Sequence, residues 1–480
     1  MGLSDRGTVK LRFVWAGAVA AAWFAAPALA AADAPAIDGR ELGFIWVVPF
    51  IGILLSIAVM PLAVPRFWHR HFGKVSAVWA ALVIVPFAIV HGVPTAAYEI
   101  VHLLLLDYIP FIVLLLALFT VTGGIHIKGN LHGSPSMNTA LLAVGTVLAG
   151  WMGTTGASML LIRPVIRAND SRRHKVHVFI FFIFLVSNIG GALTPLGDPP
   201  LFLGFLKGVS FFWTTTNLLG EVLACSIVLL AVFYAIDSYW YRKEGDSAPD
   251  PTPDSTISLE GGANIILLMG IVGVILASGT WTPGIHFSIW HVTLELQHVL
   301  RDVALIVVCA LSLKLTPARL RSDNGFGWAP MAEVAKLFAG IFITIAPALA
   351  ILRAGKDGVM APLVALVTDA SGQPNDVWYF WLTGILSSFL DNAPTYLVFF
   401  NLAGGDAGVL MGASAGTLAA ISCGAVFMGA NSYIGNAPNF MVKAVVEEAG
   451  IRMPSFFGYM AWSGGILVPL FILLTFLFVA

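Results

Sequence analysis

The chain has 480 residues, of which 58% are hydrophobic and 11% are charged, and its mean hydropathy is +0.88. About a quarter of the residues in a soluble domain are charged, so this composition excludes a soluble globular protein and predicts a polytopic membrane protein of the all-α class. The 25 basic and 26 acidic residues leave a net charge of −1, which excludes the basic field that nucleic-acid binding needs.

The first 31 residues resemble a secretory signal peptide. Three basic residues precede an apolar stretch at 13–27, and Ala28, Leu29 and Ala30 supply small residues where a signal peptidase cleaves. The apolar stretch is short for a membrane span. We therefore expect residues 1–31 to be removed, with an uncleaved first transmembrane helix as the alternative.

Apolar segments long enough to cross a bilayer follow along the chain, because about 20 residues span its hydrocarbon core. The predicted spans are 44–64, 75–93, 103–122, 217–240, 264–277 with its flanks, 303–315 with its flanks, 331–352 and 456–479.

Four further apolar segments are interrupted by small and polar residues. Segments 137–166 and 377–403 are predicted to be re-entrant hairpins, and segments 178–206 and 417–446 are predicted to be discontinuous helices. Irregular backbone at membrane depth is tolerated only where it is buried in protein or lines a water-filled cavity.

Basic loops set the orientation by the positive-inside rule. Basic residues flank segment 137–166 at Lys128 and at Arg172, which places both of its ends in the cytoplasm. Counting spans onward puts the loop around Asp369 on the outside. The two hairpins therefore enter from opposite sides, and we expect a multi-pass protein of the bacterial inner membrane with a periplasmic mature N-terminus and C-terminus.

An internal repeat relates the two halves of the chain. The pattern Ala-x-[Ser/Thr]-x-[Leu/Ile]-Gly-[Asp/Asn]-x-Pro occurs at 192–200 and again at 430–438, and the hairpin breaks at 153–156 and 391–394 have the same offset. We assign 42–242 to a first repeat, 243–262 to a linker and 263–480 to a second repeat of opposite orientation. Inverted repeats with broken helices are typical of secondary transporters, whose substrate site lies where the breaks meet.

Other classes of membrane protein have little support. The sequence contains neither an H-E-x-x-H metal motif nor a phosphate-binding Gly-x-x-x-x-Gly-Lys-[Ser/Thr] loop. We therefore predict that the protein is not an enzyme and that an ion gradient, rather than ATP, drives transport.

The broken segments resemble the ion transporter superfamily that contains arsenite permeases, citrate carriers and, as the most similar members, D-type sodium:proton antiporters. The resemblance is carried by S-N-I-G-G-A-L-T-P-L-G-D-P-P at 187–200, L-D-N-A-P-T at 390–395 and G-A-N-S-Y-I-G-N at 429–436. It implies a scaffold and a mobile part in each half, elevator-type movement and a homodimer. Dicarboxylate carriers of this superfamily tend to have Ser-Asn-Thr at both hairpin tips. Here the first tip lacks Asn and the second has Asp391, which argues against a carboxylate substrate.

Two carboxylates within the breaks, Asp198 and Asp391, have no Lys or Arg in their immediate segments. Ionisable residues at bilayer depth are usually functional, and hard oxygen ligands suit a small cation. Asp391 could also be only a helix N-cap, and Asp198 only a turn residue. The candidate ion-binding or substrate-binding residues are Asp391, Asn392, Thr395, Asp198, Asn188, Thr194, Asn431, Ser432, Asn436, Thr154, Thr155 and Ser158.

These residues lead to a hypothesis of sodium:proton antiport by alternating access. A Na⁺ site is expected at Asp391, Asn392, Asn188, Thr194 and Asn431, with no cofactor besides the transported Na⁺ and H⁺. The alternative is transport of a citrate-like carboxylate, or of arsenite or another oxyanion. The expected partners are membrane lipid, small inorganic ions or a small anion, and a second copy of the chain.

Overall fold

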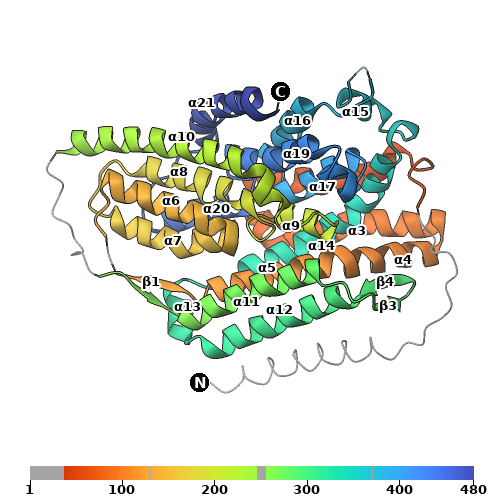
Figure 1. Ribbon diagram of the computed structural model, residues 1–480, viewed down its shortest axis with the longest axis horizontal. Helices are drawn as coiled ribbons and strands as arrows, with labels where there is room; N and C mark the ends of the chain where they lie inside the picture. The colour runs from red at the N-terminus through yellow and green to blue at the C-terminus, as the bar shows by residue number, and fades with distance from the viewer. Residues whose placement is uncertain (1–36, 130, 246–255, 370, 480) are drawn as a thin grey trace.

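A computed structural model describes residues 37–129, 131–245, 256–369 and 371–479. The predicted signal peptide lies outside these residues. Within them, nine helices are long and apolar enough to cross a membrane, which confirms a polytopic membrane protein. The helices run roughly lengthwise in Figure 1 and form two layers.

The framework layer is the set of long helices that packs along the lower side of Figure 1. In it α14 packs against α2 and α3, and α12 packs against α5 and α11. Its elements are η1 (Phe44–Val47), α2 (Val48–Ala63), α3 (Pro65–His91), α4 (Val93–Leu103), the π-helix η2 (Leu104–Tyr108), α5 (Ile109–Thr122), α11 (Gly262–Thr280), α12 (Leu296–Leu315), α13 (Ala318–Asp323) and α14 (Ala329–Arg353).

The site layer is the set of helices above it, which includes the long helix α10 and the two broken segments. The helix pairs α6–α7 and α16–α17 each reverse direction at a tip, and the segments after them break at η3 and η5. Its elements are α6 (Pro135–Met152), α7 (Thr154–Ala168), α8 (Val176–Leu185), η3 (Ile189–Leu193), α9 (Pro199–Leu206), α10 (Trp213–Glu244), α16 (Asp376–Phe389), α17 (Asn392–Leu402), α18 (Ala407–Met411), α19 (Ala415–Met428), η5 (Gly429–Asn431), α20 (Ala437–Glu448), α21 (Phe456–Leu474) and the π-helix η6 (Thr475–Val479).

Several helices extend beyond their predicted spans. The helix predicted at 75–93 begins at Pro65, because Pro is favourable in a first helical turn and the charged residues that follow it are compatible with helix outside the hydrocarbon. The helix predicted at 217–240 runs from Trp213 to Glu244. Hydropathy marks the apolar part of a helix and not its polar ends.

The all-α expectation needs a correction in the loops, where two small antiparallel sheets occur. Strand β1 (His126–Lys128) pairs with β2 (Ser258–Glu260), and β3 (His286–Ile289) pairs with β4 (Val292–Glu295). Strand β2 belongs to the predicted linker 243–262, whose residues 246–255 lie outside the described ranges. The β3–β4 turn has positive φ at Trp290 and His291, the backbone that a two-residue hairpin turn requires.

Helix α8 lies at the centre of the site layer. Nine of the ten residues in its Val-His-Val-Phe-Ile-Phe-Phe-Ile-Phe-Leu sequence, His177 to Leu185, are buried, and a helix that is apolar on nearly all sides must be enclosed by other elements. The chain that enters it is fixed by Arg172, which donates to Asp237 at 2.7 Å and to Glu244 at 2.9 Å on α10.

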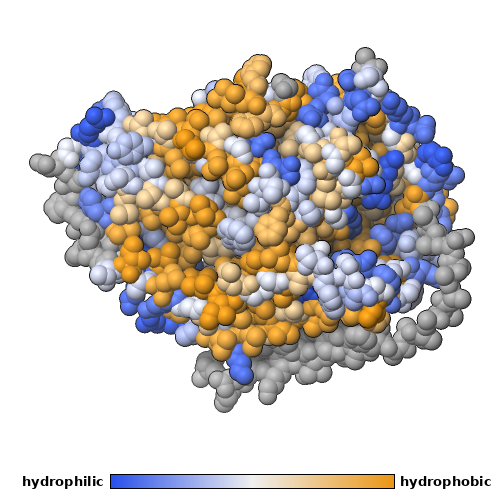
Figure 2. All heavy atoms as spheres, viewed as in Figure 1, coloured by the Kyte–Doolittle hydropathy of each residue, from blue (hydrophilic) through white to orange (hydrophobic). Residues whose placement is uncertain are grey.

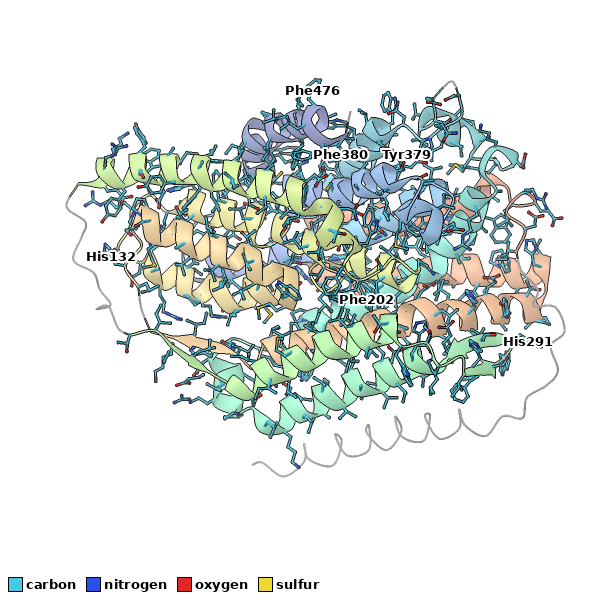
Figure 3. The ribbon with its side chains drawn as sticks, viewed as in Figure 1. His132, Phe202, His291, Tyr379, Phe380 and Phe476 are labelled. Atoms are coloured by element: carbon cyan, nitrogen blue, oxygen red, sulfur yellow. The ribbon has the colours of Figure 1, made fainter. Side chains whose placement is uncertain are left out.

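The outer surface is apolar in the middle and polar at the ends of the helices. Figure 2 shows hydrophobic residues over most of this face and hydrophilic residues toward its two ends. Large apolar side chains such as Ile89, Ile227 and Ile266 are more than 60% exposed. In Figure 3, Phe202 points into the region between the two layers, while Phe476 lies on the outer surface. Such a belt is the surface that lipid covers.

Candidate functional site

The tip of the first hairpin is held against the first helix break. Helix α6 ends at Met152, Gly153 has φ +84°, and α7 begins at Thr154. A positive φ of this kind favours glycine. The backbone N–H of Thr154 donates to the Gly197 carbonyl at 2.8 Å, and the Thr154 hydroxyl donates to the Asp198 carboxylate at 2.8 Å.

The tip of the second hairpin reaches the same carboxylate from the other half of the chain. The side chain of Asp391 caps α17 by accepting the backbone N–H of Ala393 at 3.0 Å, as the capping alternative predicted. Asn392, the first residue of α17, is fully buried and donates to the second oxygen of Asp198. The Thr395 hydroxyl donates to the Asp391 carbonyl at 2.9 Å and so belongs to the cap.

The two helix breaks contain the same local contacts. The Thr194 hydroxyl donates to the Gly150 carbonyl at 2.5 Å, and the Ser432 hydroxyl donates to the Ser388 carbonyl at 2.5 Å. Each break therefore bonds to the first helix of its own hairpin. Thr194 and Ser432 shape the two breaks rather than contact Asp198.

Glycines are needed in the breaks because the backbone folds back on itself there. A Cβ atom on Gly197 would lie 2.2 Å from the Gly191 carbonyl oxygen, and a Cβ atom on Gly435 would lie 2.6 Å from the Gly429 carbonyl oxygen. Only a residue without a side chain fits at either position.

Asp198 is the point where these segments converge. It is 1% exposed and also accepts a hydrogen bond of 3.1 Å from the side-chain amide of Asn436. Thr154, Asp198, Asn392 and Asn436 stand at or immediately before the first residue of α7, α9, α17 and α20, respectively. In the part of the chain that the structure describes, no Lys or Arg pairs with Asp198.

A second layer of amides extends the network from Asp198. Asn436 also donates to Asn188 at 3.2 Å, and Asn188 donates to the Asn439 side-chain oxygen at 2.7 Å. Asn439 in turn donates to the Gly429 and Ser432 carbonyls at 2.8 and 2.9 Å. Asn439 was not among the candidate residues predicted from the sequence, although an amide one residue after Pro438, at the start of a segment after a helix break, was a usable signal, and it is fully buried in the structure.

The remaining candidates lie near this network without contacting Asp198 through a hydrogen bond. Asn431 donates to the Ser388 hydroxyl at 2.9 Å, and the hydroxyls of Ser158 and Ser187 are 2.8 Å apart. The side-chain oxygens of Asn392 and Asn431 are buried and have no hydrogen-bond partner among the residues that the structure describes. The five residues of the predicted Na⁺ site bond to different partners, so a shared site among them stays a prediction.

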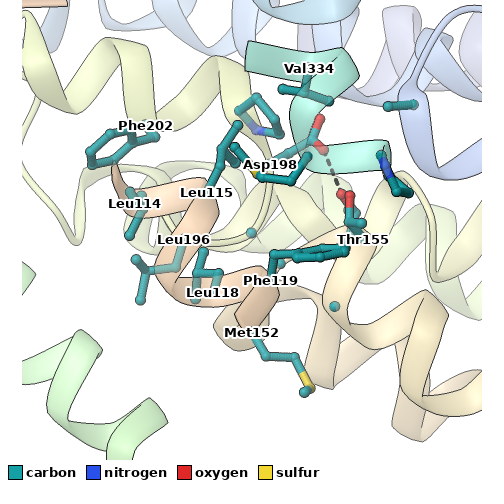
Figure 4. Close-up of a pocket in the computed structure, with 18 of the residues that line it drawn as sticks. Leu114, Leu115, Leu118, Phe119, Met152, Thr155, Leu196, Asp198, Phe202 and Val334 are labelled. Carbon is teal, nitrogen blue, oxygen red and sulfur yellow. Dashed lines mark hydrogen bonds between the residues drawn. The ribbon is translucent and has the colours of Figure 1, made fainter. Parts of the chain in front are cut away.

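A cavity of about 120 Å³ opens beside Asp198 between the two layers. Asp198 and Thr155 form its polar side, and Leu114, Leu118 and Phe119 of α5 form its apolar side (Figure 4). Met331 and Val334 of α14 complete the framework wall. The cavity can hold a small solute in contact with the hairpin tip and with Asp198.

Comparison with known proteins identifies the family. The model of a family described as "Putative citrate transport" matches residues 39–479. Two relatives, each called an uncharacterized transporter, come from Mycobacterium bovis and Mycobacterium tuberculosis. Each is 24% identical over 328 residues, which make up 66% of this chain and 71% of the relative.

The family match favours the carboxylate alternative of the sequence analysis over sodium:proton antiport. It also confirms that the chain is a transporter and not an enzyme. The chain belongs to the citrate transporter-like family and is a multi-pass secondary transporter with bacterial relatives.

Proposed function

We propose that the protein carries a small citrate-like carboxylate across the bacterial inner membrane and that the binding of a cation, Na⁺ or H⁺, is coupled to this transport. The observation that carries the proposal is the meeting of four helix N-termini, those of α7, α9, α17 and α20, around Asp198. The positive end of each helix dipole favours an anion at this convergence.

Asp198 supplies the coupling in this proposal. Its carboxylate occupies the convergence of helix ends and lines the cavity where the substrate would lie. A second anion cannot approach an ionised Asp198 without a cost of about 4 kcal/mol, for charges about 4 Å apart at an effective dielectric constant of about 20. A proton or a sodium ion at Asp198 removes that cost, so the cation and the carboxylate bind together.

The unpartnered amide oxygens support a cation in the same region. The side-chain oxygen of Asn392 is buried beside Asp198, and that of Asn431 is buried in the second break. An unsatisfied buried oxygen costs about 1–3 kcal/mol, and a small hard cation is bound by such ligands.

Alternating access is proposed to occur by movement of the site layer against the framework layer, with two inverted repeats as its structural basis. Two kinds of contact occur in both halves and support the repeat. The hydrogen bond from Thr194 to Gly150 corresponds to the one from Ser432 to Ser388. The close backbone contact between Gly191 and Gly197 corresponds to the one between Gly429 and Gly435. Corresponding residues of each pair are 238 positions apart, the same separation as Asp198 and Asn436. A homodimer is part of this proposal.

The test is gradient-driven uptake into proteoliposomes. Labelled citrate, a dicarboxylate and arsenite are offered in turn under an imposed Na⁺ or proton gradient, and at least one carboxylate should accumulate above its external concentration. Asn392→Ala should lower this uptake about tenfold or more, because it removes a hydrogen bond to a charged group. Asn217→Ala is the matched control, because Asn217 is an exposed amide on α10 that bonds within its own helix. The absence of accumulation for every carboxylate refutes the proposal.

Sodium:proton exchange is the second candidate, and one observation favours it. Asp198 and Asp391 lie at neighbouring helix starts, and no described Lys or Arg pairs with either of them. The same proteoliposomes decide between the two functions. A pH change on adding Na⁺ alone, without any carboxylate, supports exchange, while Na⁺-dependent or H⁺-dependent carboxylate accumulation supports the first proposal.

A further inference from the structure

An ion pair joins the two layers at the end of α9 that lies away from Asp198. The ammonium group of Lys207, the residue after α9, pairs with the carboxylate of Asp107 in η2. Asp107 is 8% exposed as a residue, and the Lys207 side chain is 19% exposed. The ion pair between Arg172 and Asp237 lies on the side of the site layer, and the pair between Arg319 and Glu260 joins α13 to the loop strand β2, whereas Lys207–Asp107 crosses between the two layers.

Helix α9 links this pair rigidly to the candidate site. Asp198 is the N-cap residue of α9 and Lys207 is its C-cap residue, so the eight-residue helix between them is about 12 Å long. Its flank is packed closely against the second hairpin, because a Cβ atom on Gly204 would lie 2.4 Å from the hydroxyl of Tyr396. Lys207 must therefore move with Asp198 and with α17.

Asp107 stands at an irregular turn of the framework. Residues Leu104–Tyr108 form a π-helix, and the N–H of Ile109 bonds to the carbonyl of Leu104, five residues back. Pro110 follows, and it has no N–H to continue the regular pattern. Single π-turns within longer helices are frequent at functional sites.

We infer that Asp107 and Lys207 form a charge latch that positions α9, and with it Asp198, against the framework in the state that this structure represents, and that the latch opens in each transport cycle. This inference rests on the proposed movement of the site layer. A poorly exposed pair is held by electrostatic attraction that water screens only in part. When the layers separate, each charge must find water or another partner, so the latch sets the relative population of the two states.

The first test measures layer positions without any substrate. Spin labels are placed on cysteines introduced at Ser322, on α13 of the framework layer, and at Glu448, at the end of α20 in the site layer, both of which are exposed. The native Cys225, Cys309 and Cys423 are buried and can remain. Two populations are compared: molecules with the label distance of this structure and molecules with a different distance. Asp107→Asn and Lys207→Gln should each lower the ratio of the first population to the second by at least fivefold, equivalent to about 1 kcal/mol.

Two rescue variants separate a charge latch from a local packing effect. Lys207→Arg retains the charge, and the exchanged pair Asp107→Lys with Lys207→Glu restores opposite charges, so both should return the ratio to within about twofold of the original. Lys443→Gln is the control, because it breaks a 2.7 Å ion pair inside α20 and should leave the distances unchanged. A distribution that Asp107→Asn leaves unaltered, or an exchanged pair no better than the single variants, overturns the latch.

The second test uses transport in proteoliposomes. Neutralising either charge should change the maximal rate at least threefold while the substrate concentration for half-maximal uptake changes less than twofold, because the pair does not contact the cavity. An effect confined to the half-maximal concentration overturns the latch. A single label distance under all gradients and in all variants overturns the moving-layer proposal, and with it the latch. Two distances with unaltered ratios overturn the latch alone.

Discussion

Replacing Asp198 with Asn is the sharpest perturbation of the candidate site. The variant removes one charge and almost no volume. One oxygen of Asp198 accepts from Thr154 and Asn436, and the other accepts from Asn392. The oxygen of the new amide can retain the first two bonds. Its NH₂ group then meets Asn392, whose own side-chain oxygen has no partner and can accept once the amide of Asn392 turns over.

This exchange of partners predicts a folded variant. After the turn, the NH₂ group of Asn392 lies where its unpartnered oxygen lay before, so the number of unsatisfied buried groups does not rise and no further penalty of about 1–3 kcal/mol is added. The variant also removes a carboxylate that is 1% exposed and has no described cationic partner. We expect its free energy of unfolding to stay within about 1 kcal/mol of the original or to rise.

Transport should change far more than stability. Repulsion of about 4 kcal/mol between an ionised Asp198 and a substrate carboxylate corresponds to a roughly thousandfold difference in affinity with and without the coupling cation. In Asp198→Asn this cation dependence should fall below about tenfold, and a gradient should no longer drive accumulation. Equilibrium exchange of carboxylate across the proteoliposome membrane should persist.

The measurement compares labelled carboxylate uptake over a range of Na⁺ concentrations and pH values at matched protein levels. Asp376→Asn is a useful control, because Asp376 is a carboxylate at the start of α16, away from the Asp198 network. It accepts a hydrogen bond from the hydroxyl of Thr417 on α19. Gradient-driven accumulation that survives in Asp198→Asn refutes the coupling role of this carboxylate.

Asp391→Asn should retain the cap and nearly all of the free energy of unfolding, while Asp391→Ala should lower this free energy by about 1 kcal/mol because an N-cap is removed. Thermal unfolding measures both values, and equal losses in the two variants would contradict the capping geometry. Gly197→Ala should prevent accumulation of folded protein, because its Cβ would lie 2.2 Å from a backbone oxygen. In Gly464→Ala the new Cβ meets no described atom within 4 Å, so this control variant should express normally. Reporter fusions at Arg172 and Asp369 should read cytoplasm and periplasm, respectively, and a reading on the same side would remove the inverted orientation of the two halves.

Local features of this fold were readable from sequence because they depend on neighbours in the chain. Apolar length predicted the spans, and Gly153 marked the residue between α6 and α7. The π-turn at Asp107 and the β3–β4 hairpin were not predicted, because an apolar window does not distinguish an α-turn from a π-turn and because strands of four residues carry little periodic signal.

The composition of the site depends on contacts that no local pattern contains. Asn392 meets Asp198 across 194 residues and Asn436 meets it across 238. Matched motifs indicated that the breaks were related but not which side chain would lie at their centre, and the sequence analysis favoured Asp391 where the structure makes Asp198 the more connected residue. Asn439 was missed because its partners, Asn188 and the Gly429 carbonyl, are recognisable only in three dimensions.

In the sequence, the carboxylates within the helix breaks favoured a small cation as the transported species, but Asp198 acquires a different meaning in the folded chain. Helix N-termini that converge without a negative side chain would bind an anion whether or not a cation were present. Such a site would let the substrate flow down its own concentration gradient and would make no use of the ion gradient. In the proposed mechanism, a buried Asp198 at the convergence makes the empty site unfavourable for an anion and the cation-loaded site favourable. Coupling requires this difference in affinity between the two states, because a ligand shifts an equilibrium only by its differential binding. The carboxylate is therefore compatible with an anion substrate, provided that a proton or a sodium ion accompanies it through the membrane.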